Sequence, residues 1–279
     1  MGHVKSIFLS LLLSGSIGAL VYSAYQVHLH GLDSPWIGTG IACSGFVLFI
    51  ALAYLRPRPR TSRNLLWVLA LGLIGTAAAF VLERRPGAAT MTAALLGILG
   101  DWLYVFWYSR FDKPGEALRE GQALPAMRFM EKGREVDSQD LVARPALWIF
   151  YRGNWCPLCV AQVREVAAQY SELARRGVDV FLVSPQSQGS TESLAKRFDA
   201  PMRFLVDVDN RAAAILGIVV RGGLPAGFQA LGFDSDVPRP TVFITAAGGR
   251  VLWCDISENY RVRPEPAALF HVLDRHAIV

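Results

Sequence analysis

Four long apolar segments in the first part of the chain constrain the fold most. They cover roughly residues 6–27, 36–55, 65–82 and 88–108, and each can cross a bilayer as a helix of about 20 residues. The chain of 279 residues is 52% hydrophobic and only 18% charged, which is too apolar for an ordinary soluble protein. Because three similar segments follow the first, we interpret the first as a retained helix rather than a signal peptide. We therefore predict a four-span α-helical transmembrane bundle over residues 1–112.

Small residues recur in these segments at spacings that permit close helix contact. Examples are Gly72 with Gly75 and Gly97 with Gly100. One acid, Asp101, lies inside the fourth segment, where carboxylates are rare. Asp101 therefore has a role of its own, joins helices by hydrogen bonds, or lies near the membrane surface.

Loop charge predicts the orientation of the bundle. Residues 56–63, between the second and third segments, carry four arginines, whereas residues 32–35 carry none. Arginine-rich loops stay in the cytoplasm, and an even number of spans puts both termini on that side. We expect a multi-pass protein of the cell inner membrane whose second domain is cytoplasmic. The pI of about 9.2 then reflects orientation and attraction to lipid headgroups, and no nucleic-acid motif is present.

Residues 113–279 form a second domain with an α/β pattern, after a linker around residues 111–116. Strands are expected at 147–152, 179–184, 203–207, 241–245 and 250–254. Helices are expected at 157–176, 190–198, 210–216 and 265–275. Strands that alternate with helices indicate a layered α/β fold. Gly248-Gly249 predicts a hairpin between the last two strands.

A pair of cysteines lies where the first of these strands meets its helix. The segment 150–159 reads FYRGNWCPLC, so Cys156 begins the helix and Cys159 follows one turn later. Free N–H groups and the helix dipole favour a thiolate there, so at least one cysteine should have a lowered pKa. The second thiol can then close a disulfide. A zinc site is a weaker alternative, since the downstream sequence lacks a second close pair of ligands. We predict no metal and no cofactor.

The other candidate residues have simpler interpretations. Cys43 and Cys254 are expected to fill small spaces, and four cysteines in all make no disulfide framework. His28 and His30 follow the first span, so they are expected at the membrane surface rather than as haem ligands. Four basic residues are expected to be mostly solvated, although each could contact substrate, partner or lipid. These are Arg261, Arg263, Lys132 and Arg134.

The order of these elements resembles a thioredoxin fold. In thioredoxins a cis-proline before a strand lies against the C-x-x-C pair, and Pro240 matches that position. The pattern F-Y-R-G-x-W-C-P-x-C with Pro-Thr downstream more specifically resembles peroxiredoxin-like proteins of the AhpC/TSA group. The resemblance covers roughly residues 115–279. It implies that Arg239 lies beside the reactive sulfur, where its charge would favour a thiolate.

The two resemblances give the cysteines opposite roles. Aligned with the peroxiredoxin motif, Cys159 is the peroxide-attacking cysteine, while Arg152 and Cys156 replace the proline and threonine of that motif. Aligned with thioredoxin, Cys156 attacks and Cys159 resolves. The helix terminus slightly favours Cys156 for disulfide exchange. For peroxide the choice stays open.

Two functions fit the sequence. We predict a membrane-anchored thiol oxidoreductase that reduces peroxides or protein disulfides through Cys156 and Cys159 and is recharged by a soluble thiol reductant. Four residues are expected to face the substrate or partner: Pro240, Trp155, Arg152 and Thr241. The alternative is a non-enzymatic membrane redox sensor whose partner contacts change on oxidation. Peroxiredoxin relatives often dimerise, so the resemblance also allows a homodimer.

Overall fold

The computed structural model describes residues 2–112 and 117–278, which divide into two compact units. The helical unit comprises Val4–Pro57 and Thr61–Arg110, and the α/β unit contains the chain from Phe111 onward. The predicted linker falls partly on residues 113–116, which lie outside the described residues, and the boundary after residue 112 stays a prediction.

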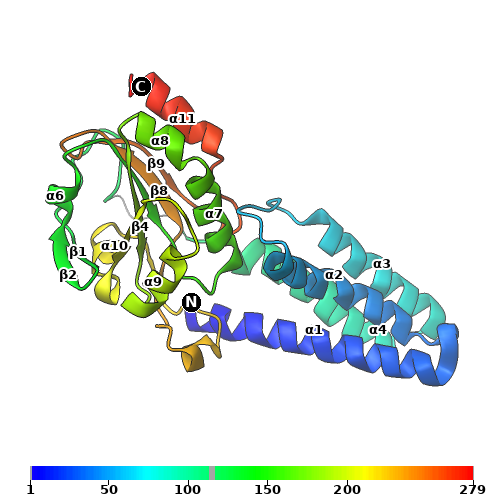
Figure 1. The fold of residues 1–279 in the computed structure, drawn as a ribbon. Coiled ribbons are helices and arrows are strands. Elements are labelled where there is room, and N and C mark those ends of the chain that lie inside the picture. The colour runs from blue at the N-terminus through cyan, green and yellow to red at the C-terminus, as the bar shows by residue number, and fades with distance from the viewer. Residues whose placement is uncertain (1, 113–116, 279) are drawn as a thin grey trace. The chain divides into compact units, whose positions relative to one another are not determined.

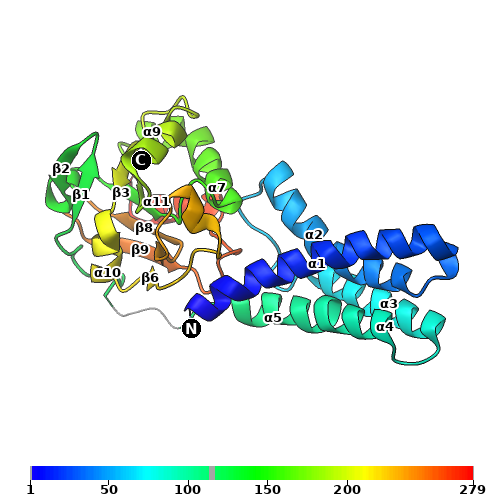
Figure 2. The ribbon, with the colours of Figure 1, turned by 90° about the horizontal axis from the view of Figure 1, so that it is seen from below.

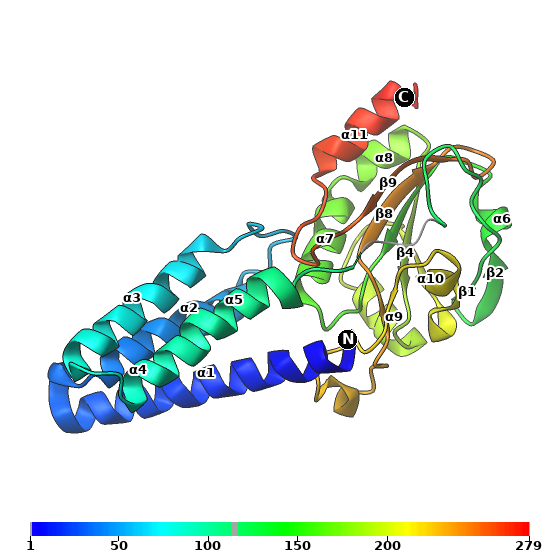
Figure 3. The ribbon, with the colours of Figure 1, turned by 180° about the vertical axis from the view of Figure 1, so that it is seen from behind.

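The helical unit is built from four apolar helical stretches (Figure 3). The first three are α1 (Gly2–His30), α2 (Trp36–Leu55) and α3 (Leu66–Glu83), and a short turn of 3-10 helix, η1 (Gly31–Asp33), follows α1. The fourth stretch consists of α4 (Ala88–Ala93), a π-helical segment η2 (Ala94–Gly100), α5 (Asp101–Leu103) and a second π-helical segment η3 (Tyr104–Tyr108). Among the described residues these four stretches are long and apolar enough to cross a membrane by length and composition. Their bounds lie close to those predicted.

Glycines let the helices of this unit approach closely. A methyl group built on Gly75 would lie 2.5 Å from the Gly38 carbonyl oxygen, and one on Gly72 would overlap the Gly97 carbonyl. Both contacts join helix backbones, so a larger residue could not be accommodated by a side-chain rotation alone. The predicted small-residue contacts are therefore confirmed at Gly72, Gly75 and Gly97.

The α/β unit is organised around a mixed sheet of order β2-β1-β5-β4-β3-β8-β9 (Figure 1). Its strands are β1 (Arg128–Glu131), β2 (Arg134–Asp137), β3 (Ala146–Phe150), β4 (Asp179–Ser184), β5 (Arg203–Val206), β8 (Thr241–Thr245) and β9 (Val251–Ile256). Strands β3, β4 and β5 are parallel, while β8 is antiparallel to both β3 and β9. The hairpin predicted at Gly248-Gly249 is confirmed, with both glycines at positive φ. A separate pair, β6 (Val219–Val220) and β7 (Val237–Pro238), precedes β8.

Helices cover both faces of this sheet. They are α6 (Ser138–Leu141), α7 (Pro157–Ala168), α8 (Tyr170–Arg175), α9 (Gln188–Ala195), α10 (Arg211–Ile215) and α11 (Pro266–Arg275), with short 3-10 turns η4 (Val208–Asn210) and η5 (Phe228–Leu231). Figure 2 shows α7, α9 and α11 on one side of the sheet and α10 on the other. The layered α/β arrangement predicted from the sequence is confirmed.

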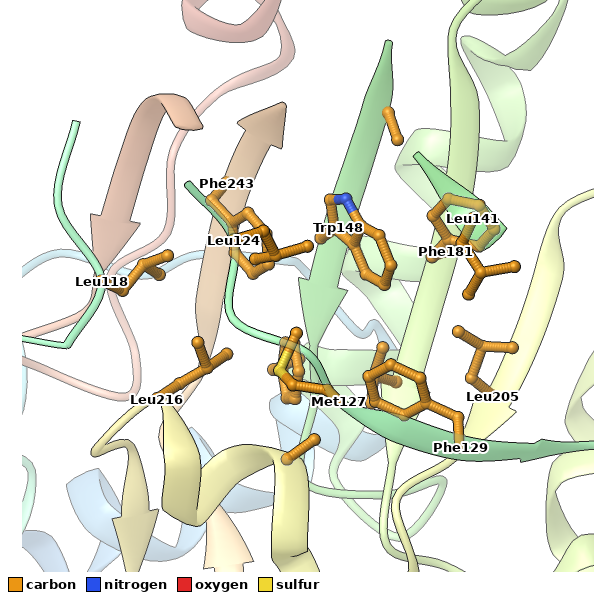
Figure 4. Close-up of a cluster of buried hydrophobic side chains, with 14 of the residues drawn as sticks. Leu118, Leu124, Met127, Phe129, Leu141, Trp148, Phe181, Leu205, Leu216 and Phe243 are labelled. Carbon is orange, nitrogen blue, oxygen red and sulfur yellow. The ribbon is translucent and has the colours of Figure 1, made fainter. Parts of the chain in front are cut away.

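The core of this unit is rich in aromatic side chains (Figure 4). Trp148 packs against Phe181 with ring centroids 4.4 Å apart and stacks on Phe243 at 5.7 Å. Full burial of one such side chain stabilises the fold by about 1.5–3 kcal/mol. Because Trp148 and its neighbours lie on the central strands, they hold β3 and its following turn in a fixed position.

One predicted helix was wrong, and one hairpin was not predicted. The helix predicted over 157–176 is two helices, because Gln169 adopts φ −98° and ψ 1° and interrupts the helical hydrogen bonding. The β1–β2 hairpin was not predicted, although its Lys132-Gly133 turn has both residues at positive φ, as a two-residue hairpin turn requires.

Candidate active site

The two cysteines lie at the turn between β3 and α7, as predicted. Cys156 is the residue that caps α7, Pro157 is the first helical residue, and the Cys159 main-chain N–H donates to the Cys156 carbonyl over 3.0 Å. The pair is free rather than disulfide-bonded. Both side chains are buried, with 2% of Cys156 and none of Cys159 exposed. The end of β3 and the start of α7 therefore hold two free thiols one helical turn apart, and both thiols are shielded from solvent.

The residue that contacts the dithiol from the far end of the chain is Arg263. Its guanidinium donates to the Cys159 sulfur over 3.4 Å and to the Gln162 side-chain oxygen over 2.9 Å. Arg263 is only 4% exposed, so the prediction that it is solvated is wrong. It lies on the loop between β9 and α11, where Ser257 Oγ donates to the Val262 carbonyl over 3.1 Å. The Arg261 N–H donates to the Asn259 side chain, and the loop is thus held by its own hydrogen bonds.

Electrostatics separate the roles of the two sulfurs. Burial by itself opposes ionisation of Cys159, but the Cys156 thiol donates to its sulfur, Arg263 lies on it, and the Arg152 main-chain N–H donates to it. Together these lower the pKa of Cys159. The same hydrogen bond to Cys159, together with burial, raises the pKa of Cys156. These directions favour the thiolate on Cys159 with Cys156 as its hydrogen-bond donor, the reverse of the preference inferred from the helix terminus.

Arg152 and Trp155 form one wall beside the dithiol. The Arg152 guanidinium lies 4.8 Å from the centroid of Trp155 and 5.3 Å from that of Tyr260, and it donates to the Gly223 carbonyl. Gly153 between them has φ +142°, and a methyl group there would lie 2.7 Å from Trp155 Nε1. Glycine is therefore required at this turn. Arg152 and Trp155 thus contact each other beside the turn that carries Cys156, and the expectation that they face a substrate stays a prediction.

A pocket of about 130 Å³ opens beside this wall. Its lining combines apolar and polar side chains: Arg152, Trp155, Pro185, Gln186, Ser187, Gly232, Phe233, Asp234 and Val237. Trp155 packs on Phe233 at a centroid distance of 6.5 Å and on Phe228 at 5.6 Å. Its volume lies below the range of about 300–1,000 Å³ that is typical of ligand pockets, so only a very small molecule would fit.

Tyr151 and Gln186 lie beneath the turn and were not predicted from the sequence. The Gln186 amide donates to the Tyr151 hydroxyl over 3.1 Å, and its oxygen accepts from the Asn154 N–H over 2.8 Å. Burial, opposed by a hydrogen bond with Ser184 and reinforced by the charge of Cys159, raises the pKa of the Tyr151 phenol. Tyr151 is thus a neutral hydroxyl beside the thiolate and supports the turn through Gln186.

Arg239 takes a different place from the one that the resemblance implies. It donates to the carbonyls of Ser257 and Asp112, each over 2.6 Å, and lies over the ring of Phe111. The cation on the Cys159 sulfur is Arg263 instead. Arg239 binds the carbonyl of Ser257, which belongs to the loop that also carries Arg263, so Arg239 supports that loop.

Pro240 and Thr241 are both buried at the start of β8. The described residues contain no cis peptide bond, so Pro240 is trans, unlike the cis-proline that the thioredoxin resemblance implies. The chain here stays extended because the Arg239 N–H donates to the Ile218 carbonyl and the Pro240 carbonyl accepts from Ser257. The Thr241 hydroxyl donates to the Arg239 carbonyl over 3.0 Å, which explains its burial without a substrate contact.

The remaining cysteines lie elsewhere. Cys254 is half-buried on β9, with its sulfur 3.9 Å from the Leu118 carbonyl oxygen, and Cys43 is buried in α2. Within residues 2–112 and 117–278, no group of three or more His, Cys, Asp or Glu side chains is arranged to hold a metal ion.

The strand order and the dithiol at the start of α7 define this unit as a thioredoxin-fold domain with a thiol site. Residues 121–253 match the sequence model of the AhpC/TSA family. Bcp of Helicobacter pylori strain ATCC 700392 / 26695, a candidate peroxiredoxin by its name, is 26% identical over 99 residues. That match covers 35% of this chain and 65% of the relative, and Bcp of strain J99 gives the same values. The α/β unit is therefore a peroxiredoxin-like domain.

Solved structures of similar proteins were also found. Peroxidoxin BcpB from Mycobacterium tuberculosis is 20% identical, covers 58% of this chain and 99% of its own, and gives a TM-score of 0.46. AhpC from Enterococcus faecalis is 17% identical, covers 57% and 93%, and also gives 0.46.

Proposed function

We propose that the α/β unit is a thiol-dependent peroxidase in which Cys159 attacks the peroxide and Cys156 resolves the product. The contact of Arg263 with the Cys159 sulfur carries this proposal, because it stabilises the thiolate that attack requires. The match to the AhpC/TSA family supports the same reaction class.

The reaction proceeds in two chemical steps. The Cys159 thiolate attacks the terminal peroxide oxygen, the O–O bond breaks, and the alkoxide or hydroxide takes a proton, which leaves a sulfenic acid on Cys159. Cys156 then attacks that sulfur, water leaves, and a Cys156–Cys159 disulfide forms. A soluble dithiol reduces this disulfide and is itself oxidised. One peroxide is thereby reduced for each dithiol consumed.

Burial of the dithiol favours a peroxide over a protein disulfide as the oxidising substrate. Exchange with a protein disulfide needs in-line access to a sulfur, whereas Cys159 is fully covered and Cys156 is 2% exposed. A peroxide is small enough to reach the sulfur through limited local motion. Reduction of the Cys156–Cys159 disulfide by a dithiol then requires the turn between β3 and α7 to open further. We propose that formation of the disulfide begins this opening.

Serine variants test the assigned roles in the purified full-length protein. Cys159→Ser should abolish hydroperoxide consumption with dithiol present. Cys156→Ser should still form one sulfenic acid per chain but should not cycle through the intramolecular disulfide. Cys254→Ser is the matched control and should retain turnover. A sulfenic acid on Cys156 in the Cys159→Ser variant, with none on Cys159 in Cys156→Ser, would reverse the assignment.

We further propose that the helical unit anchors the domain in the cell inner membrane with both termini in the cytoplasm. Its helices are long and apolar enough to span, and the residue 56–63 loop is rich in arginine. Protease should then digest the α/β unit in inverted membrane vesicles but leave it intact in spheroplasts. The opposite pattern would place the domain outside the cytoplasm.

A further inference from the structure

Asp101 is a buried acid that the proposed peroxidase chemistry does not use. It begins α5 in the fourth helical stretch, and its side chain is 0% exposed. Neither of its carboxyl oxygens has a hydrogen-bond partner within the described part of the chain. A polar group buried without a partner is costly, so this carboxyl calls for an explanation.

Asp101 lies where three helical stretches meet. A methyl group on Gly72 of α3 would lie 3.4 Å from Asp101 Oδ2. One turn before Asp101, a methyl group on Gly97 would lie 2.7 Å from the Ala42 side chain of α2. The next residue of α2, Cys43, is close enough for its thiol to interact electrostatically with the Asp101 carboxyl. The carboxyl therefore points into the junction of α2, α3 and the fourth stretch.

The backbone around Asp101 is also unusual. The π-helical segment η2 ends at Gly100, directly before Asp101, and η3 begins at Tyr104, three residues after it. Such widened turns are rare and occur frequently at functional sites. This observation is independent of the burial of the carboxyl and points to the same residue.

Three kinds of partner could stabilise the carboxyl: a basic side chain, a metal cation or a proton. The buried polar residues described in the helical unit, apart from Asp101, are serines and threonines, so no buried lysine or arginine neutralises it there. The facing residue on α2 is the thiol Cys43, α3 presents Gly72, and Leu12 of α1 packs at Gly100. These are too few oxygen or sulfur ligands for a metal ion. Of these three a proton fits the surroundings, because protonation removes the charge that burial penalises.

We propose that Asp101 is a proton-binding site inside the helical unit. The carboxyl holds its proton while α2, α3 and the fourth stretch are packed together, and it releases the proton only when this junction opens to water. The inference rests on the proposed membrane location of the helical unit but is independent of the peroxidase chemistry of Cys159.

Infrared difference spectroscopy on the full-length protein in liposomes tests this proposal. Wild type at neutral pH should show the carbonyl stretch of a protonated carboxylic acid, and Asp101→Asn should lose that band. Glu83→Gln is the control, because Glu83 accepts hydrogen bonds from Gly87 and twice from Thr90, which suits an ionised carboxylate. This control should retain the band. A wild-type spectrum without the band, or a band that is lost in Glu83→Gln instead, would overturn the proposal.

Labelling with dicyclohexylcarbodiimide provides a second test that needs no variant. This reagent modifies protonated carboxyls in apolar surroundings, and mass spectrometry of peptides should locate it on Asp101 of the wild type. Labelling should fall about tenfold per pH unit once the carboxyl ionises. If labelling is instead suppressed by sodium ions at constant pH, the site binds a metal cation and the proposal is wrong. Peroxidase activity is measured in a separate assay. A failure of the Asp101 proposal would therefore not contradict the peroxidase proposal, and a failure of the peroxidase proposal would not contradict a protonated Asp101.

Discussion

Arg263→Gln should weaken the Cys159 thiolate without changing the positions of the cysteines. Glutamine keeps part of the side-chain volume and a hydrogen-bond donor but removes the charge that lies 3.4 Å from the Cys159 sulfur. At that distance and an effective dielectric constant of about 20, the gross attraction between the two charges is about 5 kcal/mol. This value is an upper limit, because water that enters the vacated space solvates the thiolate, and the Arg152 main-chain N–H still donates to it.

The expected net loss is that of one charge-assisted hydrogen bond, about 1.5–3 kcal/mol. Because about 1.4 kcal/mol corresponds to one pKa unit, the pKa of Cys159 should rise by about 1–2 units. Well below the wild-type Cys159 pKa of about 5, the thiolate fraction and the rate of reaction with peroxide should fall about 10- to 100-fold, and this loss should shrink as the pH rises through the new pKa. At alkaline pH, where Cys159 is ionised in both proteins, the two rates should converge.

The assay is the pH dependence of Cys159 alkylation in a Cys156→Ser background, where only one of the two sulfurs titrates. Arg250→Gln in the same background is the matched control, since Arg250 is exposed. Arg263→Lys should give an intermediate midpoint, because it keeps the charge but loses the second guanidinium nitrogen that binds Gln162. A midpoint for Arg263→Gln within about 0.3 unit of its parent would refute the role of Arg263.

Two further predictions concern stability. Gly153→Ala should lower the free energy of unfolding in urea by about 1–2 kcal/mol or more, because its φ of +142° strains an alanine and the new methyl meets Trp155. Gly189→Ala in α9, which has open space, should be neutral or stabilising, and equal effects would contradict this account. Glu131→Gln should cost about 0.5–1 kcal/mol at neutral pH, because Arg203 binds both carboxylate oxygens in a partly exposed pair. Hydrogen bonds from Arg203 lower the pKa of Glu131 in the folded protein. The stabilisation from this pair is therefore present above the pKa of Glu131 in the unfolded chain and is lost as the pH falls through its folded pKa. A destabilisation by Glu131→Gln that persists in acid would contradict this account.

Most of the fold could be predicted because its signals are local. The helical unit was predicted from runs of apolar residues, and strands β3, β4, β5, β8 and β9 from short apolar segments between turns. The β1–β2 hairpin was missed because its strands are only four residues long and mostly half-buried or exposed, so they lack a strong apolar pattern. The break between α7 and α8 at Gln169 could not be predicted, because no glycine or proline lies there.

The candidate site was predicted only in part. Cys156, Cys159, Arg152 and Trp155 lie within eight consecutive residues, so one motif located them together. Arg239 was assigned by resemblance to a motif, yet its hydrogen bonds lead to Ser257 and Asp112. Its position in the sequence could not show which carbonyl groups would surround it.

The sequence by itself determined that a dithiol stands at a helix start behind four apolar segments, because hydrophobic patterning and helix capping act over a few residues. Only the tertiary structure favours one of the two sulfurs, Cys159, as the thiolate. That choice depends on Arg263, which lies 104 residues beyond Cys159 and is brought to it by the packing of the β9–α11 loop. The same holds for Asp101, whose presence in an apolar span was visible in the sequence. Its lack of a partner became visible only when three helical stretches were packed around it. Electrostatic energies depend on distance and burial in space, and neither quantity is encoded in sequence separation.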